Sequence, residues 1–308
     1  MLTTEALKAK IRSVEDLQSV VKTMKALAAV QIRQYEKAVQ ALADYHQTIE
    51  LGLQIVLKQQ YFVEDCWINF NQTPHSFLEK SQIGVIVFGS DQGLCGQFNE
   101  QVASYTLSYF KQQSFSFNHL QIAAVGMRVF SALEAATGLS IEPLFSLPSS
   151  ANGMTEKVQE VLLTIEEWQS QKQINTIFLF YNQSQSSATY KPCALQLLPL
   201  DQSKLKRLEQ QPWKTEMMPL FTMDFQSLFS ALTRQYLFVS LYRAFAESLA
   251  SENASRLSSM QAAERNIQER LEDLNAEYRH QRQTSITEEL LDIASGFEAL
   301  TQSHSIPL

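Results

Sequence analysis

Glycine and proline are scarce in this sequence, and two long stretches contain neither. Of the 308 residues only 9 are glycine and 8 are proline, and residues 2–51 and 220–295 have none. Because these two residue types most often interrupt a helix, each stretch is free to form one long helix. At about 1.5 Å per residue the second helix would be on the order of 100 Å long, so we expect it to lie against another helix.

Cysteines, long apolar runs and clusters of positive charge are also rare. The three cysteines, Cys66, Cys95 and Cys193, are far apart and form no CxxC pair, which argues against a zinc site and favours reduced thiols in a cytosolic setting. No apolar run approaches the ~20 residues that span a bilayer, and residues 1–10 lack the apolar core of a signal peptide. We therefore expect a soluble protein that stays in its compartment of synthesis. A formal net charge of −7 without a long basic run argues against nucleic acid as a partner.

Apolar residues recur at alternating spacings of three and four near both ends of the chain. The N-terminal stripe is Val14, Leu17, Val21, Met24, Ala28, Gln31, Tyr35, Ala38, Leu42, Tyr45 and Ile49. The C-terminal stripe, with one skip at Asn253, is Leu232, Val239, Tyr242, Ala246, Leu249, Leu257, Met260, Ile267, Leu271, Leu274 and Tyr278. This spacing is typical of a coiled coil. We expect the two helices to pair antiparallel, because a globular middle segment can then connect them at one end.

The middle of the chain alternates between apolar runs and amphipathic stretches. Strands are expected at residues 83–88, 120–125, weakly at 139–143, at 174–181 and, as an edge strand, at 190–200. Helices are expected at 98–110, 127–136 and 154–169, and residues 201–219 are expected to be a link. The predicted fold class is α/β, with a long antiparallel coiled coil of the terminal helices and a small Rossmann-like domain. The predicted division is 1–56 for the first helix, 57–219 for the domain with its connectors and 220–308 for the second helix.

A glycine-rich turn follows the first strand, with the sequence Ser90-Asp91-Gln92-Gly93-Leu94-Cys95-Gly96. Such turns can bind phosphate at a helix N-terminus, but this one has no lysine and fits neither the phosphate-loop nor the dinucleotide pattern. The five histidines have no metal-ligand spacing, and no nucleophile is paired with a base. We therefore expect no catalytic residue, no cofactor and no metal, and a turn that presents the domain to a partner.

Three stretches together resemble the gamma subunit of F-type ATP synthases. They are Ile11-Arg12-Ser13-Val14 with Gln18, Lys22, Met24 and Ala28-Ala29; the glycine turn, similar to Ser-Asp-Arg-Gly-Leu-Cys-Gly; and Leu241-Tyr242-Arg243-Ala244, Ala250-Ser251-Glu252, Arg256, Met260, Ala263, Asn266 and Arg282-Gln283-x-x-Ile286-Thr287-x-Glu289-Leu290. The resemblance covers the whole chain in the right order, and the last motif is very specific.

The resemblance implies a rotor that carries torque between an ion-driven membrane ring of c subunits and a catalytic ring of alpha and beta subunits. The implied partners are these rings and the epsilon subunit, with one copy of this chain per complex. The complex is expected on the cytoplasmic face of a bacterial plasma or thylakoid membrane. By residue-wise match, the expected contacts with beta subunits are Lys22, Met24, Lys25, Arg256, Arg282, Gln283 and Thr287, and the turn residues Ser90, Asp91, Gly93, Leu94, Cys95 and Gly96 belong to the foot domain.

Three departures from the family pattern favour a divergent bacterial branch that is often sodium-linked. Lys25 replaces an acidic residue, and Gln92 replaces an arginine in the turn. A third departure is that the usual basic cluster is reduced to Gln31-Ile32-Arg33-Gln34. The coupling ion and the physiological direction stay open. Two other functions also stay open: a coiled-coil scaffold, which predicts homodimers, and a nucleotide-binding α/β enzyme, against which the missing phosphate-loop lysine counts.

Overall fold

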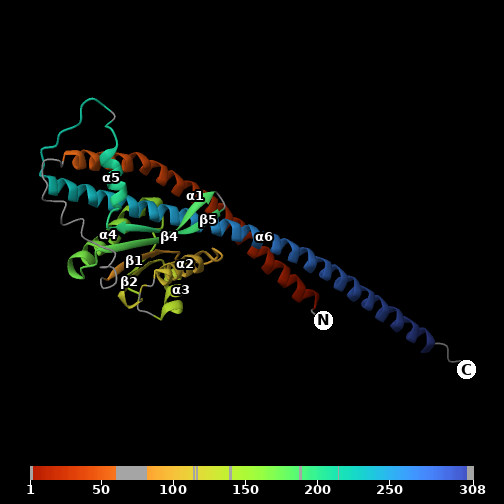
Figure 1. Ribbon diagram of the computed structural model, residues 1–308. Helices are drawn as coiled ribbons and strands as arrows, with labels where there is room; N and C mark the ends of the chain where they lie inside the picture. The colour runs from red at the N-terminus through yellow and green to blue at the C-terminus, as the bar shows by residue number, and fades with distance from the viewer. Residues whose placement is uncertain are drawn as a thin grey trace, which may run out of the picture. The chain divides into compact units, whose positions relative to one another are not determined.

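The computed structural model describes residues 3–59, 82–113, 115, 117–138, 141–186, 189–213 and 215–303. The chain divides into two compact units, one formed by residues 1–27 with 258–308 and the other by residues 28–257. Two long helices, α1 (Thr4–Gln59) and α6 (Phe225–Ser303), contribute to both units (Figure 1). Cys66, which is predicted from the sequence to be a reduced thiol, lies outside the described residues.

In the first unit, α1 and α6 pair through a small apolar cluster. Leu7 and Ile11 of α1 pack with Leu271 and Leu274 of α6, and Val14, Ile267 and Tyr278 pack against them. Further along α1, Lys25 forms an ion pair with Glu264. Residue numbers therefore rise along α1 as they fall along α6, which is the predicted antiparallel arrangement.

Leu17 departs from the predicted apolar stripe of α1. Its side chain is 57% exposed, whereas the neighbouring Gln18 is half-buried and its Nε2 donates to Oε1 of Gln268 at 3.1 Å. A straight helix has 3.6 residues per turn, whereas a strict three-four stripe repeats every 3.5 residues. The stripe therefore drifts across the helix face, and Gln18 takes the place of Leu17 in the contact.

The second unit contains a five-stranded sheet in the order β3-β2-β1-β4-β5. The strands are β1 (Ile83–Phe88), β2 (Leu120–Val125), β3 (Leu144–Phe145), β4 (Thr176–Ser186) and β5 (Thr189–Leu198). All neighbours are parallel except β5, which is antiparallel to β4. β1 is central and buried on both faces, as its unbroken apolar sequence predicts.

Helices cover both faces of this sheet (Figure 1). One face packs on α2 (Phe98–Gln112) and α3 (Met127–Thr137), and the other on α4 (Met154–Gln171) and α6. Two short 3-10 helices, η3 (Phe117–His119) and η4 (Ala151–Gly153), precede β2 and α4. The fold class predicted from the sequence, α/β with long terminal helices, is confirmed.

Three predicted boundaries need correction. The weak strand expected at 139–143 is instead β3 at residues 144–145, where the chain pairs only with the end of β2. The link expected at 201–219 contains a helix, α5 (Gln202–Gln210), whose first turn is capped by the Asp201 carboxylate accepting from the Ser203 amide. α6 begins at Phe225 rather than residue 220, because Asp224 accepts from the Ser227 amide and so caps the helix there.

Candidate functional site

The glycine-rich turn lies at the carboxyl end of β1, where it passes very close to neighbouring segments. A Cβ on Gly89 would lie 2.3 Å from Cβ of Val129 on α3, so only glycine fits there. Gly126, just before α3, has φ +109°, and a Cβ on it would lie 2.8 Å from the carbonyl carbon and oxygen of Ser90. These two glycines bring the turn and the start of α3 into direct contact.

Asp91 fixes the conformation of the turn. Its Oδ1 accepts from the Met127 amide at 2.9 Å and its Oδ2 accepts from the Leu147 amide at 2.8 Å. The carboxylate thus binds the first turn of α3, where the helix dipole favours negative charge, and the segment that follows β3. Three separate segments of the second unit are joined by one side chain.

The interior of the turn is a closed network of short hydrogen bonds. Asn99 of α2 accepts from the Ser90 amide and donates to the Ser90 hydroxyl, both at 2.9 Å, and the hydroxyl donates to the carbonyl of Gln92 at 2.8 Å. Cys95 is buried beside this network, and burial raises the pKa of its thiol. A protonated, enclosed thiol is a poor nucleophile, so the geometry suits a structural turn.

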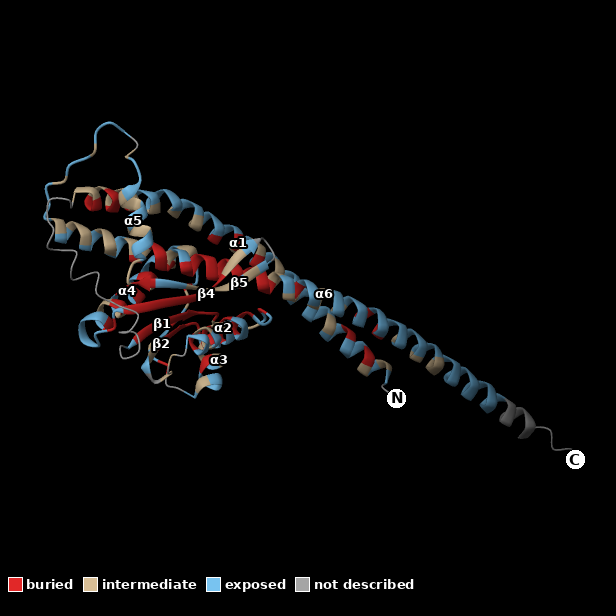
Figure 2. Cartoon of the chain, in the orientation of Figure 1, coloured by how far each residue is buried: buried red, intermediate tan, exposed pale blue. Residues whose placement is uncertain are grey.

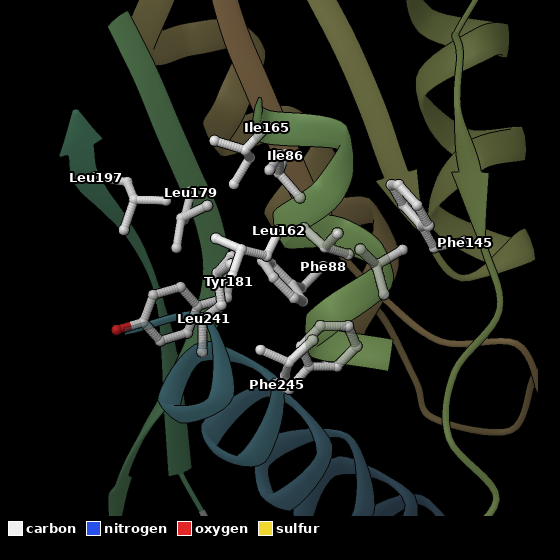
Figure 3. Close-up of a cluster of buried hydrophobic side chains, with 14 of the residues drawn as sticks. Ile86, Phe88, Phe145, Leu162, Ile165, Leu179, Tyr181, Leu197, Leu241 and Phe245 are labelled. Atoms are coloured by element: carbon white, nitrogen blue, oxygen red, sulfur yellow. The ribbon is translucent and has the colours of Figure 1, made fainter. Parts of the chain in front are cut away.

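The segment of α6 at residues 244–256 is buried on every face (Figure 2). We call it the buried segment of α6. On the sheet side, the rings of Phe245 and Phe88 lie edge to face with centroids 4.9 Å apart, and Leu241 and Tyr181 adjoin them (Figure 3). Tyr35 of α1 belongs to the same cluster. The sheet domain and α1 together therefore enclose this part of α6.

Unlike an ordinary buried helix, this segment is rich in polar residues. They are Glu247, Ser248, Ser251, Glu252, Asn253, Ser255 and Arg256. Two of them bond to the main chain of the glycine turn: the Ser255 hydroxyl donates to the carbonyl of Cys95 at 2.6 Å, and Nη2 of Arg256 reaches the carbonyl of Gly93 at 3.5 Å. The hydroxyl groups of Tyr190 on β5 and Ser255 also lie 3.2 Å apart.

Arg256 is held mainly by its own helix. Its Nη2 donates to Oε1 of Glu252 at 2.6 Å, and its Nη1 donates to Oδ1 of Asn253 at 3.1 Å. Burial raises the pKa of Glu252 although the Arg256 guanidinium acts in the opposite direction. Oε2 of Glu252 and Nε of Arg256 have no hydrogen-bond partner within the described residues.

A cavity of about 280 Å³ opens beside this ion pair, between α1, the turn and α6. Its lining includes Gln31, Tyr35, Asp91, Glu252 and Arg256. Asp91 is committed to two amides and Arg256 to Glu252, so no pairing of a base with a nucleophile arises at this cavity. Among the described residues, no cluster of histidine, cysteine and acidic side chains could hold a metal ion.

The predicted contact residues fall in both units. In the first unit Lys22, Arg282, Gln283 and Thr287 are exposed, whereas Met24 and the ion-paired Lys25 are half-buried. Arg256 belongs to the second unit and is buried there. Whether these residues contact beta subunits stays a prediction.

Sequence reasoning did not predict that Ser255 bonds to the turn. The signal in the sequence was that the polar residues of the buried segment of α6 do not follow the single stripe expected of a solvent-facing helix side. Separately, the part of the chain that the structure describes contains no helix with the length and hydropathy required to cross a bilayer.

The fold and the site define a class of protein in which two long terminal helices pair and a sheet domain in the middle of the chain encloses one of them. Comparison with known proteins assigns this class to a family. The family model described as ATP synthase matches residues 3–300. The chain therefore belongs to the ATP synthase family.

Relatives and solved structures place the chain more narrowly within that family. It is 29% identical over 308 residues to an ATP synthase gamma chain of Haemophilus influenzae strain 86-028NP and 26% identical over 300 residues to that of Ehrlichia chaffeensis, in each case over 97% of this chain and 100% of the relative. The predicted resemblance to gamma subunits is confirmed, and with it the role of central-stalk subunit in a rotary ATP synthase.

The fold is also that of a chain in the Euglena gracilis mitochondrial ATP synthase. In a structure of its rotor the TM-score is 0.64 at 14% identity, covering 92% of this chain and 98% of that one. In a structure of its OSCP, F1 and c-ring the TM-score is 0.65 at 16% identity, covering 99% and 97%. At such low identity the likeness concerns the fold alone.

Proposed function

We propose that this chain transmits torque between a c-ring and a ring of alpha and beta subunits, and so couples ATP synthesis or hydrolysis to proton or sodium transport. The observation that carries the proposal is the match of the ATP synthase model to residues 3–300, which includes both long helices and the sheet domain between them. A shaft needs a stiff element and a firm attachment to it. The antiparallel helix pair and the buried segment of α6 meet these two needs.

The chain acts without catalytic residues of its own. At the cavity beside Arg256, Asp91 accepts from two main-chain amides and Arg256 donates to Glu252. Burial raises the pKa of the Cys95 thiol, which opposes nucleophilic chemistry. Catalysis then belongs to partner subunits. The Euglena structures with the same fold are of a rotor and of an OSCP, F1 and c-ring assembly, which supports the alpha and beta ring and the c-ring as partners.

The remaining assignments extend the same proposal. One copy of the chain serves each complex, with the epsilon subunit beside the sheet domain, at the cytoplasmic face of a bacterial membrane. Residues 1–56 and 220–308 form the shaft and 57–219 the foot. The exposed Arg282, Gln283 and Thr287 suit polar contacts with beta subunits, because an arginine fork binds carboxylates in a directional way. Lys25, ion-paired with Glu264, and Gln92 in the turn support the divergent bacterial branch that is often sodium-linked, and the coupling ion stays open.

Co-expression with the cognate alpha and beta subunits tests the proposal. We expect a complex with one copy of this chain per three alpha–beta pairs, measured by native mass spectrometry, and sustained ATP hydrolysis that depends on its presence. Alpha and beta subunits that assemble and turn over equally well without the chain would contradict the proposal. In that case the scaffold alternative predicts a homodimer of the isolated chain, which size-exclusion chromatography with light scattering detects.

A further inference from the structure

The buried ion pair between Arg256 and Glu252 contributes little net stability to the fold, because removing both charges from water is energetically unfavourable. Both side chains are buried, and the pair leaves Oε2 of Glu252 and Nε of Arg256 without partners in the described residues. Burying two charges costs several kcal/mol each, and replacing such a pair with apolar residues of similar size is often neutral or stabilising. Stability alone therefore does not account for these two residues.

Their geometry points to a mechanical role. The buried segment of α6 carries several small side chains, Ala244, Ala246, Ala250 and Ala254 among them. Such a surface packs closely but resists rotation of the helix about its own axis only weakly. Resistance to rotation grows with the distance of a contact from that axis, and α-helix Cα atoms lie only about 2.3 Å from it. Long or directional side-chain contacts are needed to fix the rotation of the helix about its own axis.

Ser255 and Arg256 supply such contacts to the glycine turn. The Ser255 hydroxyl bonds to the carbonyl of Cys95, and the Arg256 guanidinium extends to the carbonyl of Gly93 while Glu252 and Asn253 hold it in position. The turn in turn is fixed to α3 and to the segment after β3 by Asp91. An unbroken chain of bonds thus runs from α6 into the sheet domain.

We propose that Ser255 and the Arg256–Glu252 pair are positioning residues that fix the angle of α6 within the sheet domain, so that torque passes between the two with little twist. The inference rests on the proposed function as a rotor. It gives the glycine turn an internal role: the turn receives α6 of its own chain. This gives Arg256 a role inside its own subunit, separate from its predicted contact with a beta subunit.

The test compares stability with torsional stiffness. The variant Glu252→Met with Arg256→Met removes the pair but keeps apolar packing, and Ser255→Ala removes the hydroxyl that bonds to the carbonyl of Cys95. Arg265→Gln is the control, because Arg265 is exposed and donates to the Gln261 carbonyl of its own helix. Each full-length chain is assembled with its alpha and beta partners, which are immobilised. A probe is coupled at the exposed Ala135 of α3 through an azide-bearing residue, and its angular spread is recorded while the complex is stalled.

We expect the double methionine variant to unfold at the same temperature as the unaltered chain or higher, while the variance of the probe angle rises about twofold. Ser255→Ala should raise the variance less, and Arg265→Gln should leave it unchanged. An unchanged variance in both test variants would overturn the inference. If the double variant fails to fold, Ser255→Ala alone decides. Failure of the unaltered chain to assemble or rotate is a different result, which would contradict the proposed rotor function instead.

Discussion

At the scale of single residues, the two described cysteines, the buried Cys95 and the half-buried Cys193, behave as structural groups. Burial raises the pKa of the Cys193 thiol to about 11, and Cys193 lies against the Tyr181 carbonyl, to which it donates at 3.4 Å. Burial also raises the pKa of Cys95. Because the thiolate is the reactive form, both side chains should be nearly inert at neutral pH.

This predicts slow alkylation of the folded chain. At pH 7.5 a thiol whose pKa is raised from 9.0 to about 11 has on the order of a hundredfold less thiolate. Iodoacetamide should therefore modify Cys193 on the order of a hundredfold more slowly in the folded chain than in denaturant. Cys95 should be protected as well. Peptide mass spectrometry over time measures both rates, with the denatured chain as the control. Equal rates in the folded and denatured chain would contradict the assignment.

The sequence predicted that the glycine turn is structural but not how it is held. The absence of a phosphate-loop lysine concerns only the residues of the turn itself, so it can be read directly from the sequence. The partners of Asp91, the amides of Met127 and Leu147, lie 36 and 56 residues further along the chain. The bond from Ser255 to Cys95 spans 160 residues. Such contacts depend on how the whole domain folds, and no local pattern encodes them.

At the scale of elements, a carboxylate of α1 that two cationic or titratable side chains share helps to attach α5 to the helix pair. Oε1 of Glu50 on α1 accepts from Nζ of Lys204 on α5 at 2.7 Å, and Nδ1 of His46 lies 3.6 Å from the same oxygen. Lys204 also lies over the ring of Tyr236 on α6, 5.1 Å from its centroid. Protonated His46 would compete with Lys204 for Glu50.

Attachment of α5 should therefore weaken in mild acid. Burial lowers the pKa of His46; the Glu50 carboxylate opposes the shift, and the Lys204 and Arg243 cations add to it. When α5 is detached, His46 has its ordinary pKa of 6.5 and so takes up a proton at a higher pH than when α5 is attached. The attachment of α5 is therefore fully stabilised above pH 6.5, and this stabilisation falls as the pH drops from 6.5 towards the lowered pKa. Hydrogen exchange in residues 202–210, corrected for intrinsic rates, should be faster at pH 5.5 than at pH 7.5.

The matched control for this prediction is His46→Gln, which keeps a polar side chain without a titratable group. In that variant the difference in α5 exchange between the two pH values should shrink towards the change seen in α4, which serves as an internal reference. A difference that persists at full size would show that another group governs the attachment. Lys204→Met should speed exchange of α5 at both pH values, because it removes the ion pair.

The elements that the sequence predicted well are those with their own strong pattern. β1 and β2 were predicted at their observed bounds because β1 is a continuous apolar run, β2 is apolar apart from Gln121, and a glycine follows each of them. α5 was not predicted, since it is short and highly polar and has no buried residue. β3 was misplaced because its two residues pair only with the end of β2, which is a tertiary property.

At the scale of the whole molecule, the paired helices were predicted from periodicity and their identity from resemblance. The stripes predicted which helix faces meet, and the packing of Val14 against the buried Leu271 and Leu274 agrees with them. Leu7 and Ile11 of the same cluster lie ahead of the predicted stripe. The predicted contacts with other subunits come only from the match of motifs, because a contact surface on an exposed helix has no apolar signature of its own. Residues such as Arg282 look like ordinary solvated side chains in the isolated chain.

The last prediction follows from that exposure. Arg282→Ala should leave the unfolding temperature of the isolated chain unchanged, because the side chain is exposed and surface substitutions of this kind rarely shift stability by more than about 0.5 kcal/mol. In the assembled complex it should slow ATP hydrolysis on the order of tenfold, if one charge-assisted hydrogen bond worth about 1.5 kcal/mol is lost when the shaft passes a beta subunit. Arg279→Ala is the control, since Arg279 is also exposed and bonds to the Asn275 carbonyl of its own helix. Equal turnover for the two variants would count against the contact, whereas a loss confined to Arg282→Ala would place this residue at the moving surface between shaft and ring.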